Sequence, residues 1–207
     1  KHLGEIECFW YEGEKGAGIS VKKYLCQYKD AVVPPQVMIT SCTGFDGNSI
    51  DPFQRSQMWD CLNDRERILS ECKFQVVATD MMAAALSAGE RAELDMDFLD
   101  ALVELYPDCE AVYFHHSGKL ILADDIRNYQ GGGSRFVRFA VNARFFNIQG
   151  TNDMVVDTIG MGTLFLPDLQ YHFHGMDPNW VVNHAYCTAA YILNNDNPIK
   201  QDDPIDG

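Results

Sequence analysis

The chain has 207 residues, 46% of them hydrophobic and 12% aromatic, and its 30 acidic and 16 basic side chains give a formal charge of −14. This length suits a compact domain with its own core, so we expect residues 1–207 to form a single domain. The acidic surplus argues against nucleic-acid and anionic-membrane partners, because Lys and Arg neutralise the phosphates of both. No apolar run approaches the ~18 residues of a membrane span.

Seven cysteines are spread along the chain without a Cys-x-x-Cys pair. Their odd number and irregular spacing argue against a disulfide framework and a zinc ribbon. Buried free thiols in a reducing compartment are the favoured interpretation. The first residues, Lys1 to Tyr11, carry charges and lack the apolar region of a signal peptide. We therefore expect a cytoplasmic protein.

The N-terminal third is predicted to contain two extended segments and one helix. Residues 6–11 are typical of a strand that ends in a turn at 12–16. Residues 32–40 are extended, because two prolines keep their start out of a helix. Asp51 and Pro52 have the chemistry of a helix cap and first turn. Apolar residues at helical spacing extend this helix to Cys72. They are Met58, Trp59, Leu62 and Leu69.

The middle of the chain is predicted to alternate between strands and one helix. Residues 74–78 indicate a short buried strand, and residues 92–106 a helix that ends before Pro107. Residues 111–115 and 120–123 flank a hairpin turn. The clearest predicted strand covers residues 135–148, where apolar side chains alternate with polar ones. The apolar positions are Val137, Phe139, Val141, Ala143 and Phe145.

The last part of the chain is predicted to hold two strands and a helix. Residues 154–158 and 169–173 are strand-like and are separated by a Gly-rich turn. Asp177 and Pro178 begin a helix that runs to about Asn194. Antiparallel strands with helices between them favour an α+β fold, a mostly antiparallel sheet with helices packed on one face.

The order of the predicted elements from residue 74 onward, together with three features, carries a family resemblance. The three features are the Asp157-Thr-Ile-Gly160 step, the strand from Leu166 to Phe173, and a Tyr-Ile-Leu helix end followed by the acidic residues 202–207. The chain resembles the bacterial family known as domain of unknown function 4261 over roughly residues 74–207, with residues 1–73 as a lead-in. The resemblance implies a fold and a bacterial origin, and no reaction or cofactor. More distantly, the chain is similar to acidic immunity or adaptor proteins encoded near bacterial toxin and secretion systems.

His172 and His174 project from the same face of a predicted strand, because side chains alternate with period two. Together with Asp168 they could ligate a divalent transition metal, with a further ligand from the 115–116 hairpin. The alternative is a pair of surface histidines on an edge strand, because this spacing alone lacks the pattern of known zinc signatures.

Three further motifs favour structural roles. Asp157 before Gly160 is typical of a turn closed by side-chain-to-backbone hydrogen bonds. The His-His-Ser sequence at 115–117 has no nucleophile elbow around it, so an ordinary polar turn is favoured. The glycines at 131–133 lack the Gly-Lys-Ser/Thr ending of a phosphate loop and open a predicted strand, so a phosphate site is rejected.

Arg135, Arg138 and Arg144 form a basic stripe on the predicted strand 135–148. These arginines either pair with carboxylates on neighbouring strands or contact a partner, and both interpretations stay open. Arg138 and Arg144 are the residues that we predict for a partner surface.

The leading hypothesis is a non-enzymatic bacterial protein without a cofactor. It would bind a basic protein partner through its acidic surface, as an immunity-like or adaptor factor. The alternative is a metal-dependent hydrolase-like enzyme that uses His172, His174 and Asp168 in a concave pocket. A third hypothesis is a homodimer formed through an edge strand.

Overall fold

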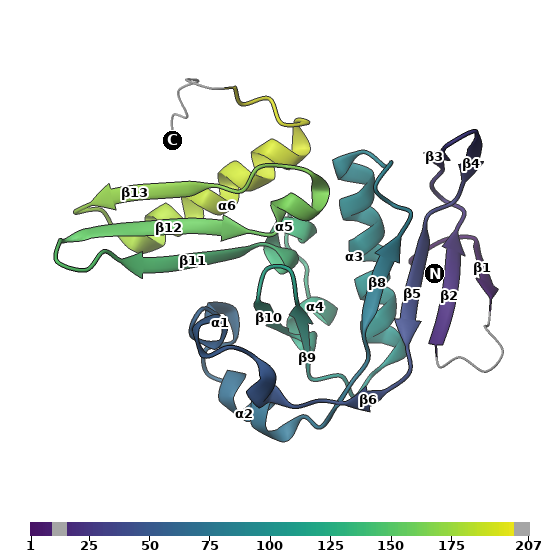
Figure 1. The fold of residues 1–207 in the computed structure, drawn as a ribbon, viewed down its shortest axis with the longest axis horizontal. Helices are drawn as coiled ribbons and strands as arrows, with labels where there is room; N and C mark the ends of the chain where they lie inside the picture. Colours follow the sequence, from purple (N-terminus) through teal and green to yellow (C-terminus); the bar gives the residue numbers. More distant parts are fainter. Residues whose placement is uncertain (10–15, 201–207) are drawn as a thin grey trace.

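The computed structural model describes residues 1–9 and 16–200, in which two antiparallel sheets flank a helical middle (Figure 1). The strands are β1 (Ile6–Phe9), β2 (Gly16–Val21), β3 (Cys26–Tyr28), β4 (Ala31–Val33), β5 (Gln36–Thr40), β6 (Thr43–Gly44), β7 (Phe74–Gln75), β8 (Ala78–Met81), β9 (Ala111–Phe114), β10 (Lys119–Leu122), β11 (Asn142–Asn147), β12 (Asp153–Ile159) and β13 (Gln170–His174). The α-helices are α1 (Pro52–Ser56), α2 (Arg65–Glu71), α3 (Ala88–Leu105), α4 (Ala123–Arg127), α5 (Arg135–Ala140) and α6 (Pro178–Asn194). Short 3-10 turns are η1 (Gly47–Ser49), η2 (Trp59–Cys61) and η3 (Met161–Leu164). The predicted α+β fold is confirmed.

The N-terminal sheet has the strand order β1-β2-β5-β8, with antiparallel pairing throughout. One of its faces packs on α3, where Val21 and Val37 meet Leu94 and Phe98 in a shared cluster. Because alternate residues of a strand point to opposite faces, only one face of this sheet contributes to the core. Figure 1 shows α3 standing between this sheet and the rest of the molecule.

The C-terminal sheet has the order β11-β12-β13, and α6 covers one of its faces. Val156 and Phe173 from the sheet pack against Val181 and Ala185 of α6. Between the two sheets, α3, α5, α6 and η3 share the largest core cluster, which includes Phe139. Burial of this apolar surface stabilises the fold at roughly 25 cal/mol per Å² removed from water.

Helices α3 and α6 confirm the predictions at 92–106 and 177–194. Asp177 caps α6 by accepting a hydrogen bond from the Asn179 amide, with Pro178 in the first turn. Helix α3 begins four residues earlier than expected, because Ser87 and Glu90 form a capping box. The hairpin β9–β10 and the strands β12 and β13 are also confirmed.

The predicted strand 135–148 is wrong in its first half. Residues Arg135–Ala140 form helix α5, and only Asn142–Asn147 form strand β11. The buried positions Phe136, Val137, Phe139 and Ala140 follow helical spacing, and the Ser134 side chain accepts from the Val137 amide as a cap. The glycines at 131–133 therefore precede a helix, which removes one of the two reasons for rejecting a phosphate site there. Their lack of a Gly-Lys-Ser/Thr ending still holds.

The single helix predicted from Asp51 to Cys72 is wrong, since the segment divides into α1, η2 and α2. Asp51 does cap α1, as expected. The break comes at Gln57, whose side-chain oxygen accepts from the Phe145 amide of β11 and from the Trp59 indole. Trp59 and Leu62 are consequently exposed instead of sharing a buried stripe.

Three other predictions change in the N-terminal part. The predicted strand at 74–78 is interrupted, since β7 ends at Gln75 and β8 begins at Ala78, and it is not buried, because Phe74 is 74% exposed. Strand β2 and the hairpin β3–β4 were not predicted, and residues 10–11 of the expected first strand lie outside the described residues.

All seven cysteines are free thiols, yet only Cys26 and Cys61 are buried. Across residues 1–9 and 16–200, no helix has both the length and the apolar character that crossing a membrane requires.

Lys119 is the largest fully buried side chain of the described residues, with 1% of its surface exposed. Its ammonium donates to the Val141 carbonyl at 2.8 Å and to the Tyr186 hydroxyl at 3.2 Å, and it lies 3.2 Å from an Asp60 carboxylate oxygen. Arg138 shares that carboxylate at 3.0 Å. A buried charge of this kind is tolerated only when its donors are paired. The cluster joins η2, β10, α5 and α6.

Asp95 of α3 is half-buried beside Asp80 and Arg91. Burial raises the pKa of Asp95 to about 7, and the charge of Asp80 adds to this shift while Arg91 opposes it. In the unfolded chain an Asp titrates near pH ~4. Above that pH the folded state still holds a proton that the unfolded state has released, so stability falls as the pH rises towards 7.

We expect Asp95→Asn to raise the free energy of unfolding by about 1–2 kcal/mol at a pH near 8, because the amide never ionises. At a pH near ~4 the variant and the parent protein should be equally stable. Urea unfolding at both pH values measures the difference. An equal gain at both would show that ionisation of Asp95 is not its cause.

Candidate functional site

The residues predicted as metal ligands lie at different ends of the C-terminal sheet. His172 Nε2 is 3.2 Å and His174 Nδ1 is 3.0 Å from the two carboxylate oxygens of Asp153 at the start of β12. Asp168 lies beyond the other end of β12, next to Thr158. The structure thus brings the histidines together with Asp153 and not with Asp168. Within the ranges described by the structure, no group of three or more His, Cys, Asp or Glu side chains is arranged to hold a metal ion.

Asp168 closes the Gly-rich turn that follows β12. Its carboxylate accepts hydrogen bonds from the Thr158 hydroxyl at 3.2 Å, the Met161 amide at 3.1 Å and the Gly162 amide at 3.4 Å. The Thr158 hydroxyl in turn accepts from the Leu169 amide. The Asp168 carboxylate thereby satisfies backbone donors of η3. The expected turn is present, with Asp168 and Thr158 as its polar centre.

The three arginines lie on two elements, so they do not form one stripe. Arg135 and Arg138 are on α5, and Arg144 is on β11. Arg144 stands opposite Asp157 across the strand pair, and its Nε donates to that carboxylate at 2.8 Å. Arg138 pairs with Asp60, and Arg135 pairs with two carboxylates of α3. Each arginine is therefore paired within the chain, and a partner contact through Arg138 or Arg144 stays a prediction.

The His-His-Ser turn shows no arrangement of nucleophile and base. The rings of His115 and His116 pack edge-on against Tyr113 and Phe114. Ser117 is buried, and its hydroxyl has no hydrogen-bond partner. A buried hydroxyl of this kind is closed to a substrate from solvent, which favours the structural interpretation of the turn.

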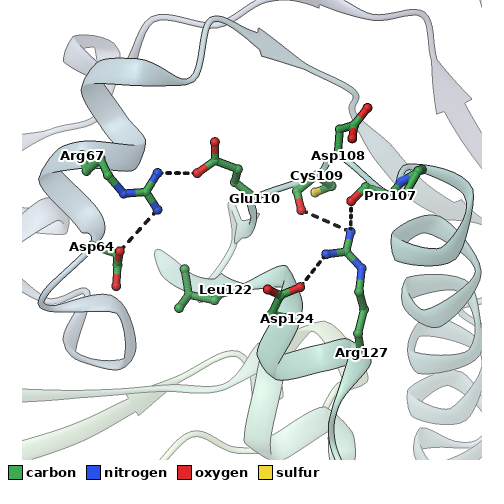
Figure 2. A pocket seen from close by; sticks show the side chains of 9 residues that line it. All are labelled: Asp64, Arg67, Pro107, Asp108, Cys109, Glu110, Leu122, Asp124 and Arg127. Atoms are coloured by element: carbon green, nitrogen blue, oxygen red, sulfur yellow. Dashed lines mark hydrogen bonds and ion pairs between the residues drawn. The ribbon is translucent and has the colours of Figure 1, made fainter.

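An open, acidic pocket of about 350 Å³ lies where α2, the C-terminal end of α3 and α4 meet (Figure 2). Four carboxylates from three separate segments line it, together with two arginines and the half-buried Cys109. The carboxylates are Asp64, Asp108, Glu110 and Asp124, and the arginines are Arg67 and Arg127. We call this set the acidic pocket.

Both arginines of the acidic pocket are already engaged within the chain. Arg67 pairs with Asp64 at 3.3 Å and with Glu110, as Figure 2 shows. Arg127 pairs with Asp124 at 2.8 Å and also donates to the carbonyls of the chain that leaves α3. A cation at a helix C-terminus satisfies free carbonyls and is favoured by the helix dipole. Arg127 therefore has a structural role at the end of α3.

The carboxylates of the acidic pocket outnumber its cations. Asp108 is exposed and forms no hydrogen bond or ion pair with the residues that the structure describes. Burial raises the pKa of the Cys109 thiol, so that group stays neutral at neutral pH and adds no charge. A surplus of negative charge around an open concavity attracts cationic groups. The pocket is suited to a basic side chain presented from outside.

The acidic pocket was missed in the sequence because its walls come from residues 64–67, 107–110 and 122–127. Pairing of these segments depends on how α2 packs beside the β9–β10 hairpin, which no local spacing reveals. The one available signal is the cluster of acids around Pro107, which was interpreted only as a helix end.

No curated protein and no solved structure matches the chain significantly. One family model does match part of the chain. The matched segment begins at Asp157, later than the predicted start at residue 74, and includes η3, β13 and α6. Residues 157–207 match the model of the family described as Domain of unknown function (DUF4261), which confirms the predicted resemblance over that segment.

Proposed function

We propose that this chain is a non-enzymatic protein-binding factor, of the immunity-like or adaptor kind, whose acidic pocket receives a basic side chain of a partner protein. The observation that carries the proposal is the composition of the pocket, with two internally paired arginines and four carboxylates, of which Asp108 is unpaired among the described residues. The formal charge of −14 would also steer a basic partner towards the chain and speed encounter.

The size of the acidic pocket supports a side chain as its occupant. At about 350 Å³ it falls near the lower end of the range of small-ligand sites, and it is open to solvent. A guanidinium group could pair with two carboxylates at once, since its planar fork matches carboxylate geometry. The rim position of Asp108 makes it a first contact for such a group.

Titration with a labelled, arginine-rich peptide tests this proposal, with fluorescence anisotropy as the readout. We expect Asp108→Asn combined with Asp124→Asn to weaken binding roughly three- to tenfold, since each exposed ion pair contributes up to ~1 kcal/mol. Added salt should weaken binding further, because exposed charges are screened.

The matched control for each single pocket substitution is Asp30→Asn in the β3–β4 turn, which removes one carboxylate far from the pocket (Figure 1). The control should bind the peptide as the parent protein does. Equal weakening by the pocket variant and by the control would reduce the effect to net charge and would overturn the assignment to the pocket. Failure of the peptide to bind at low salt would overturn it as well.

A further inference from the structure

Strand β13 forms one edge of the C-terminal sheet, and no strand of the described residues pairs with its outer side (Figure 1). On its inner side, the Thr158 amide donates to the Leu169 carbonyl, so the hydrogen-bonded pairs of β12 and β13 follow at every second residue from there. The residues between these pairs direct their backbone groups away from β12. They are Gln170, His172 and His174. Their amides and carbonyls have no hydrogen-bond partner within residues 1–9 and 16–200.

The opposite edge of the same sheet is closed. Two outward amides of β11, those of Ala143 and Phe145, donate to the Tyr186 hydroxyl and to the Gln57 side-chain oxygen, both at 3.2 Å. Edge strands are usually protected in this way, or by Lys, Pro or a bulge. Strand β13 contains neither Lys nor Pro, and its register with β12 is continuous over all five residues. The edge of β13 is therefore able to accept a further strand.

Three aromatic rings line this edge on the side of α6. The Tyr171 ring of β13 meets the His184 ring of α6 edge-on, with 5.5 Å between centroids, and the Tyr171 hydroxyl lies 3.2 Å from His184 Nδ1. Trp180, one helical turn earlier, stacks on His184 with 5.2 Å between centroids. The row thus leads from β13 to an indole that is 52% exposed. We call the outward backbone of β13 and these three rings the β13 edge.

Backbone hydrogen bonding restricts what can cover the β13 edge. A row of unpaired amides and carbonyls along an extended strand is satisfied as a whole by another extended chain. Side chains of an added strand alternate, so every second one would face α6, beside Tyr171 and Trp180. The side chains between them would lie next to His172, on the face away from α6. The geometry therefore selects an extended segment with apolar side chains at alternate positions.

The charge around the β13 edge selects an uncharged segment of another protein. Neither β13 nor α6 contains Asp, Glu, Lys or Arg, whereas 22% of the whole chain is charged. A charged side chain that faces α6 would lose hydration without gaining a partner. A second copy of this chain would bring its own charge of −14 against the −14 already present. A neutral segment of a different protein meets neither penalty.

We propose that the β13 edge binds an extended, uncharged segment of a partner protein by strand addition, with apolar side chains against Tyr171 and Trp180. Backbone hydrogen bonds give such complexes their affinity, and contacts with alternate side chains give their specificity. The β13 edge is separate from the acidic pocket, and the proposal does not depend on the function of that pocket.

Titration of the complete chain with the synthetic peptide acetyl-Thr-Val-Thr-Tyr-Thr-Val-Thr-amide tests the proposal, because this peptide is uncharged and alternates as required. Hydrogen exchange measured by NMR reports on single amides. At a peptide concentration about ten times Kd, exchange of the outward amides should slow about tenfold, because only the unbound fraction exchanges. The amides of Tyr171 and Phe173, already paired with β12, should change less.

Two outcomes of the exchange experiment contradict the proposal. Unchanged exchange at the outward amides of β13, whatever the peptide concentration, would show that no strand is added there. Slowing that follows the protein concentration without peptide would assign the edge to a second copy and overturn the choice of occupant.

Two variants test the rings and the backbone separately. Trp180→Ala should weaken peptide binding roughly tenfold or more, because aromatic anchors dominate binding energy. His172→Pro should have a similar effect, because it removes an outward amide and places a ring on the edge while the pairing with β12 stays intact. Circular dichroism checks that both variants fold.

Each variant has a matched control. Trp59→Ala removes an indole of similar exposure, 45%, on η2. Cys8→Pro removes an amide that points away from β2 on the edge strand β1. Both controls should bind the peptide as the parent protein does. Equal weakening by the variants and their controls would overturn the assignment to the β13 edge.

The acidic pocket and the β13 edge can fail independently. Asp108→Asn combined with Asp124→Asn should leave binding of the uncharged peptide unchanged, and added salt should alter it little. Loss of this binding in the pocket variant would place the peptide in the pocket and contradict strand addition.

Discussion

Lys119→Ala is expected to lower the free energy of unfolding by about 3–5 kcal/mol, because it removes one partner of a buried ion pair and leaves a cavity. The Val141 carbonyl and the Tyr186 hydroxyl would lose a charged donor in the interior, and Asp60 would keep only Arg138. Chemical unfolding followed by tryptophan fluorescence measures the change.

Two further variants separate charge from packing at this position. Lys119→Met keeps the volume of the stem, so it should be less destabilising than Lys119→Ala by the contribution of the cavity. Adding Asp60→Asn to Lys119→Met should recover part of the lost stability, because it removes a carboxylate that has lost one of its two cationic partners. Lys22→Met, an exposed lysine paired with exposed Glu5, should leave the unfolding midpoint nearly unchanged. Equal losses for Lys119→Met and Lys22→Met would contradict a role for the buried charge.

The elements that the sequence predicted well are those whose signals are local. Helix α6 was placed within a residue at each end, because its cap, its Pro178 and its apolar spacing all lie inside the segment. The hairpin β9–β10 is similar, since its turn residues adjoin its strands. Local propensity and pattern agree in these segments, and that agreement makes a segment predictable.

The elements that were mispredicted are those in which two patterns compete or a distant contact decides. Residues 135–147 contain apolar residues that satisfy both a helical and an alternating pattern, and the Ser134 cap settles the first six as a helix. The helix after Asp51 breaks because Gln57 hydrogen-bonds to β11, 88 residues further along the chain. Neither the register of β11 nor the position of Gln57 follows from local spacing.

In the candidate site, too, local features were predicted and contacts between distant residues were not. The sequence correctly placed His172 and His174 on one face of a strand, yet their common partner Asp153 comes from the neighbouring strand. Pairing of Arg144 with Asp157 was one of two open interpretations, and the strand register supplies the geometry for it. Partners across a sheet depend on register, and register is fixed by tertiary packing.

Asp168→Ala is expected to destabilise the fold by about 2–4 kcal/mol, because backbone donors of the turn after β12 would lose a charged acceptor. The amide of Met161 matters most, since that residue is fully buried. Asp168→Asn keeps an acceptor for one of the donors and should lose less. Thermal unfolding of the three proteins gives this order.

The comparison with His172→Gln distinguishes a structural from a ligand role for Asp168. His172 is exposed and pairs with Asp153 on the sheet surface, so its replacement should change the unfolding midpoint little. If Asp168 and the two histidines instead shared a metal, zinc or another divalent metal would stabilise the parent protein, Asp168→Ala and His172→Gln would both lose that gain, and a chelator would abolish the difference between each variant and the parent protein. The bonds of Asp168 to Thr158, Met161 and Gly162 favour the first outcome, in which the loss is independent of metal and confined to Asp168.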